Sequence, residues 1–407
     1  MNGGSVFRRP ISTTERMYFP MRELAPPFLM QLVIPGEGEI DPERLRRAVA
    51  TAAAVTPGAR LVRRGTDWVD SGIAPAVRVV PGHVLWAPEL ETDPVLTSPI
   101  GPTADATVEV LLLTAAPVTL IFRVFHGVMD GMGMVLWTTN VLRALRGEDP
   151  LPQRDPIADQ ELVGRLGAPG KPTPMVPRYR SAVGAGRQRR GAPRHLLRHR
   201  RIEAAGPGAL ARVCALLAAE TPGTSRIMMP VDLRRHDPAL RSTANLALPL
   251  FLDLAPGQDW TEVKDRIKSG LGADRELNQL ANTRITLVPD AVNRGILHTT
   301  NWLGARWGRN LASATVSHMG RSGADELAVP GFRPTGLFVL PQHSVAMPLL
   351  FGLTEFDGHT ELTVSARNGD GIPARLEALL DRITAMLESE LPEGNSVAGE
   401  GTGQLGQ

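Results

Sequence analysis

One short stretch of the chain combines residue types that could move a proton. His126 follows an apolar run over residues 118–124, and Asp130 and Gly131 come after three intervening residues. Imidazole titrates near neutral pH, so His126 is a candidate general acid or base. Asp130 places a fixed negative charge close to it in the sequence, and Gly131 permits a tight turn or a close backbone approach. The stretch is therefore a candidate catalytic loop.

The elements that must position this loop are a strand before it and a helix after it. Residues 118–125 are predicted to form the strand, and the apolar positions between Met134 and Leu145 fit one face of a helix that ends near Arg146. A further helix is expected to begin at Asp41, because an N-cap residue, a proline and an acidic residue follow one another there. The first half of the chain thus mixes helices and strands around a sheet.

The second half repeats this mixture of elements. Strands are expected over 226–234, 247–254, 312–317, 335–340 and 360–365, and helices over 208–220, 261–271 and 373–390. The predicted fold class is α/β, with strands and helices in two layers (α+β).

Between the two halves lies a segment rich in Gly, Pro and Arg. No acidic residue occurs between Arg178 and Arg201, where there are nine arginines. We interpret 164–201 as a crossover linker that separates an N-terminal lobe (1–163) from a C-terminal lobe (202–392), followed by a flexible tail (393–407). The arginines form either a solvated linker surface or a docking surface for phosphates.

The composition excludes several classes of protein. The formal charge is +2 over 407 residues, which argues against a nucleic-acid partner, and the single cysteine, Cys214, excludes an internal disulfide. No apolar segment follows the N-terminus, and Glu109 and Pro117 interrupt the longest apolar stretch. A cytoplasmic protein without a membrane span is expected. His195 and His199 have helical i,i+4 spacing, but their arginine neighbours argue against zinc, so no metal is predicted.

The motif resembles the signature of one superfamily. His126, Asp130 and Gly131 match the His-x-x-x-Asp-Gly string of chloramphenicol-acetyltransferase-like acyltransferases, which include peptide-synthetase condensation domains and polyketide-associated acyltransferases. Residues 12–16, 56–61, 230–234 and 242–245 resemble other segments of these proteins. The resemblance implies two similar lobes that form a pseudo-dimer with a tunnel at their interface.

Some features depart from that pattern. Condensation domains usually have two adjacent histidines, whereas here the first of these positions is Phe125. Their later motifs are not recognisable, and neither is the Asp-Phe-Gly-Trp-Gly string of the plant-type alcohol acyltransferases, which belong to the same superfamily. These departures favour a free-standing O- or N-acyltransferase over an enzyme that forms peptide bonds.

The resemblance also implies roles for individual residues. His126 would be the general base that activates a hydroxyl or amine of a small molecule, in natural-product or lipid tailoring. The acyl donor would be a thioester, either acyl-CoA or an acyl group on the phosphopantetheine of a carrier protein, with no tightly bound cofactor. Asp130 would brace the loop by binding an arginine, for which Arg234 and Arg235 are candidates, and Gly131 would bring backbone near the substrates. Asn245 and Ser317 are candidates for donating to the oxyanion or lining the substrate site.

Two other functions remain open at this stage. The chain could be a non-acylating enzyme, such as a cyclase, dehydratase or epimerase, that uses His126 for proton transfer. It could also be a catalytically silent module that docks a carrier protein. A monomer is expected in each case.

Overall fold

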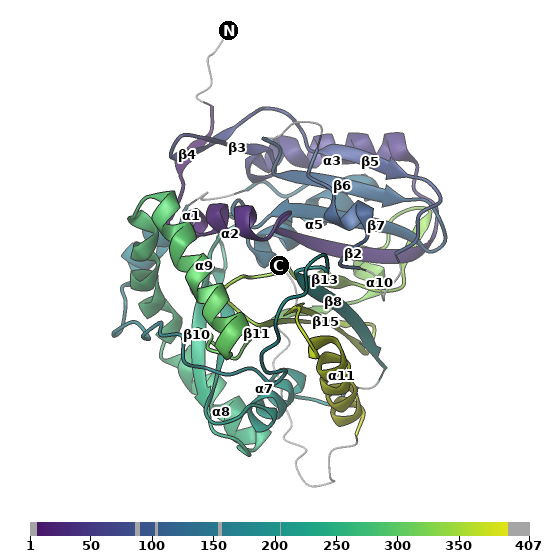
Figure 1. Cartoon of the computed structure of the whole chain (residues 1–407). Helices are drawn as coiled ribbons and strands as arrows, with labels where there is room; N and C mark the ends of the chain where they lie inside the picture. The colour runs from purple at the N-terminus through teal and green to yellow at the C-terminus, as the bar shows by residue number, and fades with distance from the viewer. Residues whose placement is uncertain (1–5, 86–89, 102–104, 154–156, 204, 390–407) are drawn as a thin grey trace.

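The computed structural model describes residues 6–85, 90–101, 105–153, 157–203 and 205–389, so the tail predicted at 393–407 lies outside the described residues. The chain forms two lobes, each with a six-stranded sheet. In Figure 1 the first lobe lies at the top and the second at the bottom. This arrangement agrees with the predicted α/β fold of two lobes.

The sheet of the first lobe contains the strand that leads to the candidate loop. Its strand order is β12-β2-β7-β6-β5, with β13 also paired to β2. The strands are β2 (Leu29–Gly38), β5 (Ala76–Val80), β6 (Val108–Leu113), β7 (Val118–Phe125), β12 (Phe332–Pro334) and β13 (Phe338–Leu340). Every residue of β7 is buried, because the strand is central in the sheet and both of its faces are covered.

Two helices pack their apolar stripes against this sheet. They are α3 (Pro42–Val55) and α5 (Gly131–Arg146), and both bury leucine, valine or tryptophan side chains in the same core cluster as β7. Asp41 caps α3 by accepting hydrogen bonds from the amides of Glu43 and Arg44, as the sequence predicts. Helix α5 ends at Arg146, and the next residue, Gly147, caps it with φ of 81°, a conformation that favours glycine. The predicted strand, loop and helix around His126 are therefore confirmed.

The second lobe has the same two-layer plan. Its strand order is β10-β9-β11-β14-β15-β8. The strands are β8 (His195–Ile202), β9 (Ser225–Asp232), β10 (Ala247–Leu254), β11 (Ala314–Ser322), β14 (Leu349–Phe356) and β15 (His359–Arg367). The helices α7 (Ala209–Glu220), α8 (Trp260–Gly272) and α11 (Ile372–Glu388) share the core of this lobe. Cys214 lies in that core, and burial raises the pKa of its thiol to about 12.

Two features differ from the sequence-based expectation. First, residues 195–201 of the predicted linker are not irregular, because they form most of β8, which pairs with β15 along its whole length. His195 and His199 therefore lie on a strand and not on a helix. Second, β12 and β13 come from the second half of the chain but pair with β2 in the sheet of the first lobe. The segment that follows β11 thus crosses between the lobes.

The remaining elements are short, apart from one helix that the sequence did not predict. A small sheet contains β1 (Arg8–Pro10), β4 (Asp67–Asp70) and β3 (Leu61–Arg64). The short helices are α1 (Thr13–Arg16), α2 (Tyr18–Leu24), η1 (Pro57–Arg60), α4 (Pro94–Thr97), α6 (Asp159–Leu166), η3 (Leu233–His236) and α10 (Ala324–Leu327). The 3-10 segment η4 (Arg275–Leu287) leads to α9 (Asp290–Trp307), the unpredicted helix on the left in Figure 1.

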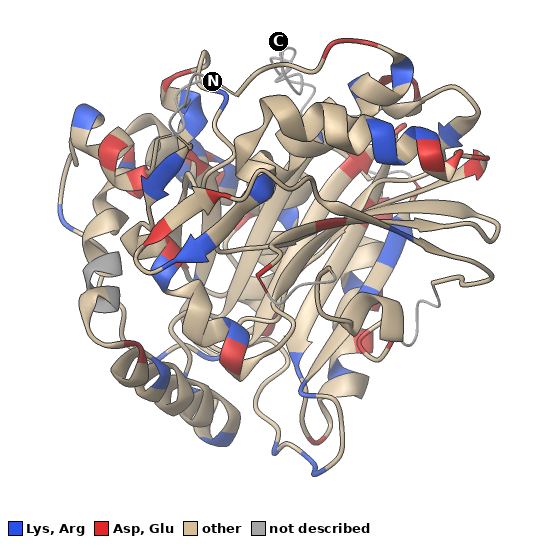
Figure 2. Ribbon diagram, turned by 90° about the horizontal axis from the view of Figure 1, so that it is seen from above, with Lys and Arg blue, Asp and Glu red and all other residues tan. Residues whose placement is uncertain are grey.

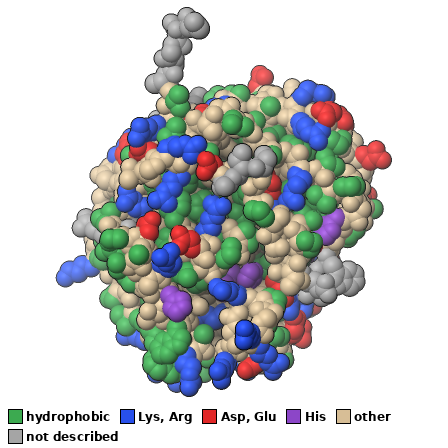
Figure 3. All heavy atoms as spheres, turned by 45° about the horizontal axis from the view of Figure 1, so that its top comes forward, with side chains coloured by type: hydrophobic (Ala, Val, Ile, Leu, Met, Phe, Trp, Pro, Cys, Tyr) green, Lys and Arg blue, Asp and Glu red, His purple; other side chains and the backbone are tan. Residues whose placement is uncertain are grey.

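Charged residues of both signs are spread over the molecule. Figure 2 shows blue and red segments on outer helices and loops, while the central strands are mostly tan. On the face shown in Figure 3, basic side chains are interspersed with acidic and hydrophobic ones. None of the helices in the described ranges has the length and apolar character needed to cross a bilayer.

The close contact between Gly133 of α5 and Thr243 gives a test of the interface. A Cβ on Gly133 would clash with the backbone carbonyl of Thr243, whereas a Cβ on Gly164 in α6 would meet nothing within 4 Å. We predict that Gly133→Ala lowers the free energy of unfolding by about 1–3 kcal/mol through overpacking. Gly164→Ala is the control, and it should raise that free energy by up to about 1 kcal/mol because alanine favours the helix. Equal effects in urea titrations would contradict the close contact.

Candidate active site

The loop between β7 and α5 holds His126 in a defined orientation. The imidazole is half-buried, and its Nδ1 lies 3.1 Å from the carbonyl oxygen of Met129. A carbonyl only accepts hydrogen bonds, so Nδ1 carries the proton and Nε2 keeps its lone pair. The loop is closed by a bond from the amide of Val128 to the carbonyl of Phe125 at 2.9 Å. Nε2 is therefore the atom of His126 that is available to accept a proton.

Aromatic side chains fix the plane of the imidazole. The ring of Tyr18 stacks on it with a centroid distance of 4.3 Å and an interplanar angle of 19°. The ring of Phe28 lies beside both, with its centroid 6.4 Å from that of His126 and 5.8 Å from that of Tyr18. Burial lowers the pKa of His126, while the Met129 carbonyl and the charge of Asp130 act in the opposite direction. The net lowering favours the neutral imidazole that a general base requires.

Tyr18 was missed by the sequence analysis. It follows residues 12–16, where Ser12 and Glu15 form a capping box at the start of α1. Glu15 is buried and also accepts hydrogen bonds from Arg9 and from the indole of Trp68. Residues 12–16, which resemble a segment of the acyltransferase superfamily, therefore anchor the short helices that place Tyr18 over His126. One signal was present, since Tyr18 is one of only two tyrosines in the chain, but the sequence gives no indication of its stacking partner.

The side chain of Phe125 points into the core of the first lobe. It is 1% exposed and packs near Phe19 and Trp68, with ring-centroid distances of 5.6 and 6.5 Å. The position before His126 therefore belongs to the hydrophobic core, which accounts for an apolar residue there.

Asp130 joins the loop, the following helix and the second lobe. Its carboxylate accepts a hydrogen bond from the amide of Gly133 at 2.6 Å, which caps α5, and another from the amide of Leu246 at 2.7 Å. The guanidinium of Arg234 adds two more bonds, at 3.0 and 3.2 Å. Both side chains of this ion pair are buried. The carboxylate therefore holds the loop and does not face His126 as a proton acceptor.

Arg234 is itself held in place by several acceptors. It donates to the carbonyl oxygens of Ser242, at 2.7 and 2.9 Å, and of Ala244, at 2.9 Å, and to the carboxylate of Asp232 at 2.6 Å. Of the two arginine candidates, only Arg234 is brought to Asp130.

Arg235 points elsewhere. Its guanidinium donates to the carboxylates of Asp274 and Glu276 at 2.8 and 2.9 Å. Together with His236, these two carboxylates make the one group in the described chain whose ligand atoms could hold a metal ion. Arg235 already supplies a positive charge at that point, so the group is an ion-pair network that does not require a metal.

The remaining site candidates are Asn245 and Ser317 on the second lobe and Gly131 at the start of α5. The side-chain amide of Asn245 donates to the carbonyl oxygen of His126 at 2.7 Å, so Asn245 holds the loop from the opposite lobe. A Cβ on Gly131 would lie 2.9 Å from the Cε of Met319, which covers the start of α5. Ser317, two residues before Met319 on β11, has its hydroxyl 3.9 Å from the Met319 sulfur.

Four of the nine arginines between Arg178 and Arg201 form ion pairs within the described residues. Arg198 binds Glu91 and Glu377, Arg200 binds Glu377, Arg201 binds Glu361, and Arg189 binds Asp370. His199 also contacts Glu361, at 2.6 Å. Acidic residues from distant parts of the sequence therefore neutralise the arginines of β8, whereas Arg180, Arg187 and Arg190 are exposed and form no ion pair within the described residues. The phosphate-docking surface stays a prediction.

Of three comparisons with known proteins, the one with solved structures found matches. No family model matches the sequence, and no curated protein matches it. Solved structures do match. The condensation domain of Monacolin K polyketide synthase MokA aligns with a TM-score of 0.63 at 15% identity, over 95% of this chain and 98% of that one.

Two other structures are similar. Polyketide synthase associated protein 5 from Mycobacterium tuberculosis has a TM-score of 0.59 at 16% identity, over 96% of this chain and all (100%) of that one. A mutant starter condensation domain of rhizomide synthetase RzmA, in complex with C8-CoA, has a TM-score of 0.58 at 15% identity, over 94% and 95% of the two chains. The chain has the condensation-domain fold. The resemblance inferred from the motif is thereby confirmed at the level of the fold.

The interface tunnel remains a prediction. Three pockets are described in the structure, and none of the three has His126 among its lining residues.

The buried ion pair between the lobes gives a second test. Removing one partner of such a pair leaves an uncompensated charge, so Arg234→Gln should lower the free energy of unfolding by about 3–5 kcal/mol. Arg321 is the control, since it pairs with Glu355 but its side chain is 73% exposed. Arg321→Gln should change that free energy by no more than about 1 kcal/mol. Chemical denaturation of both variants measures the difference, and a similar small loss in the two would contradict a stabilising role for Arg234.

Proposed function

We propose that the protein is an acyltransferase that moves an acyl group from a thioester to a hydroxyl or amine of a small molecule. The observation that carries this proposal is the state of His126. Burial lowers the pKa of its imidazole and so favours the neutral form, and its Nδ1 is bound to the Met129 carbonyl, which leaves the lone pair on Nε2. Asp130 and Asn245 hold the surrounding loop from two sides, which keeps this atom in a fixed position.

The reaction follows from these contacts. The Nε2 of His126 accepts the proton of the acceptor hydroxyl or amine while the acceptor oxygen or nitrogen attacks the thioester carbonyl. The new bond forms first, and the carbonyl oxygen becomes an oxyanion. The carbon–sulfur bond then breaks, and the leaving thiolate takes the proton back from the imidazolium. Since the thioester is already activated, no covalent bond to the protein is needed.

The oxyanion needs a hydrogen-bond donor, and Ser317 is the better of the two candidates. One amide hydrogen of Asn245 is already used on the His126 carbonyl. Among the described residues, the hydroxyl of Ser317 has only the weak sulfur contact with Met319, so its proton is available. We therefore assign Asn245 to loop positioning and Ser317 to the substrate side.

The donor is proposed from the structural neighbours. One of them was solved with C8-CoA, and others are condensation domains of synthetases. These proteins support an acyl-CoA or a carrier-protein thioester as the donor here. The core position of Phe125 is consistent with a free-standing enzyme that acts on O- or N-acceptors.

The general base is tested by substitution. We predict that His126→Ala lowers acceptor-dependent release of free thiol by about 100- to 10,000-fold. The assay combines a panel of acyl-CoAs and acyl-carrier proteins with alcohol and amine acceptors. His298→Ala is the matched control, because His298 is exposed on α9, and it should retain the wild-type rate.

Each outcome of this assay has a distinct meaning. Acceptor-dependent release that survives His126→Ala would refute His126 as the base. If the wild-type protein released no thiol with any donor, acyl transfer would be refuted, and the result would favour a non-acylating enzyme or a silent docking module.

The pH dependence provides a further test. Burial lowers the pKa of His126 from 6.5, so the base stays neutral to a lower pH than a free imidazole does. We predict that kcat/KM falls on the acid side with an inflection below pH 6.5. Burial also raises the pKa of Asp159 to about 6, and its carboxylate lies next to Thr14 in α1. The Asp159→Asn variant should keep the inflection, and its disappearance would assign the titration to Asp159.

A further inference from the structure

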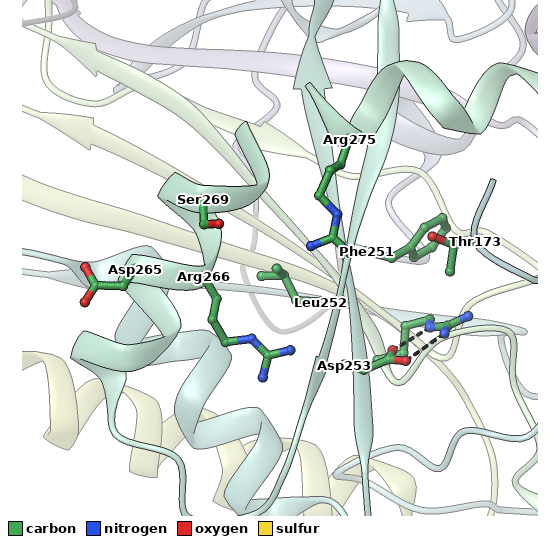
Figure 4. Close-up of a pocket in the computed structure, with 9 residues that line it drawn as sticks. Thr173, Phe251, Leu252, Asp253, Asp265, Arg266, Ser269 and Arg275 are labelled. Atoms are coloured by element: carbon green, nitrogen blue, oxygen red, sulfur yellow. Dashed lines mark hydrogen bonds and ion pairs between the residues drawn. The ribbon is translucent and has the colours of Figure 1, made fainter. Parts of the chain in front are cut away.

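A pocket of about 340 Å³ lies in the second lobe, and His126 does not line it. Five segments of the chain contribute: the crossover, strand β9, strand β10, helix α8 and segment η4. The lining residues are Thr173, Arg226, Phe251, Leu252, Asp253, Asp265, Arg266, Ser269 and Arg275. Figure 4 shows this pocket. Its volume lies within the range of small-molecule sites.

Two of the charged residues neutralise each other. The guanidinium of Arg226 donates to both carboxylate oxygens of Asp253, at 2.6 and 2.8 Å, and to the carbonyl of Pro174 at 2.7 Å. Arg226 is 4% exposed and lies over the rings of Tyr179 and Phe251, at 4.4 and 5.5 Å from their centroids. Asp253 is therefore fully engaged and does not offset the other arginines of the pocket.

The other two arginines point into the same space. In Figure 4, Arg266 extends from α8 and Arg275 from η4, and both guanidinium groups end close to Leu252. Arg266 donates to the amide oxygen of Gln258 at 3.1 Å, which is a neutral partner. Within the described chain, no acidic partner is seen for either guanidinium.

The hydroxyl and apolar groups complete the pocket. Asp265 also lines the pocket, although in Figure 4 its carboxylate points away from the two arginines. Phe251 and Leu252 add apolar surface beside the cations. The pocket therefore combines two guanidinium groups that form no ion pair within the described residues, one carboxylate and a hydroxyl with an apolar wall.

We propose that this pocket binds a phosphate monoester. Guanidinium groups donate paired hydrogen bonds to phosphate oxygens, and Arg266 and Arg275 supply two positive charges against the single negative charge of Asp265. Ser269 supplies a further donor, and the apolar wall accommodates the organic part of the ester. The site is separate from the proposed acyl-transfer centre.

Isothermal titration calorimetry with phenyl phosphate and with inorganic phosphate tests the proposal. Phenyl phosphate should bind several-fold more tightly than inorganic phosphate because of the apolar wall. Arg266→Gln and Arg275→Gln should each weaken binding by about tenfold or more, since each removes charged hydrogen bonds. Lys268→Gln is the control, because Lys268 is exposed on α8 and does not line the pocket, and it should bind as the wild type does.

The result that overturns the proposal is binding that is absent in the wild type or equally strong in both arginine variants. Both arginines are exposed, so their replacement should leave thermal unfolding unchanged, and this measurement excludes misfolding as the cause of a loss. His126→Ala should bind phenyl phosphate like the wild type, so failure of this site and failure of the acyl-transfer proposal remain distinguishable. Displacement of phenyl phosphate by coenzyme A would identify the phosphate source as the donor, and lack of displacement would identify a separate phosphate ester.

Discussion

The buried ion pair between Asp130 and Arg234 is the constraint on which the site depends. Two charges are removed from water there, which is costly unless their hydrogen-bonding capacity is satisfied. Asp130 meets this condition with the amides of Gly133 and Leu246, and Arg234 meets it with three backbone or carboxylate partners. Because these partners come from both lobes, the loop adopts its shape only when the lobes are packed together.

The same packing orients the imidazole. Asn245 on the second lobe binds the backbone of His126, the Met129 carbonyl fixes its tautomer, and Tyr18 fixes its plane. These contacts arise from three different parts of the chain. An imidazole held in this way loses little entropy when a ligand binds, and this preorganisation would favour the proposed role of His126 as a base.

Much of the local structure could be predicted from the sequence. The strand before His126 and the helix after it follow from apolar periodicity, and the start of α3 follows from its capping residues. What could not be predicted depends on contacts between distant segments. Strand β8 was not predicted because its sequence is rich in arginine. The sequence does not show that Glu91, Glu361 and Glu377 lie beside these arginines and neutralise them. Tyr18 was missed for the same reason, since its position over His126 is set by the tertiary fold.

The crossing of β12 and β13 into the sheet of the first lobe has a consequence for how the chain is made. During synthesis the N-terminal lobe emerges first, but one edge of β2 has no partner until residues 332–340 leave the ribosome. An open strand edge is a site for wrong pairing and aggregation. The first lobe therefore cannot complete its sheet as an independent nascent domain, and the two lobes reach their final form together late in translation.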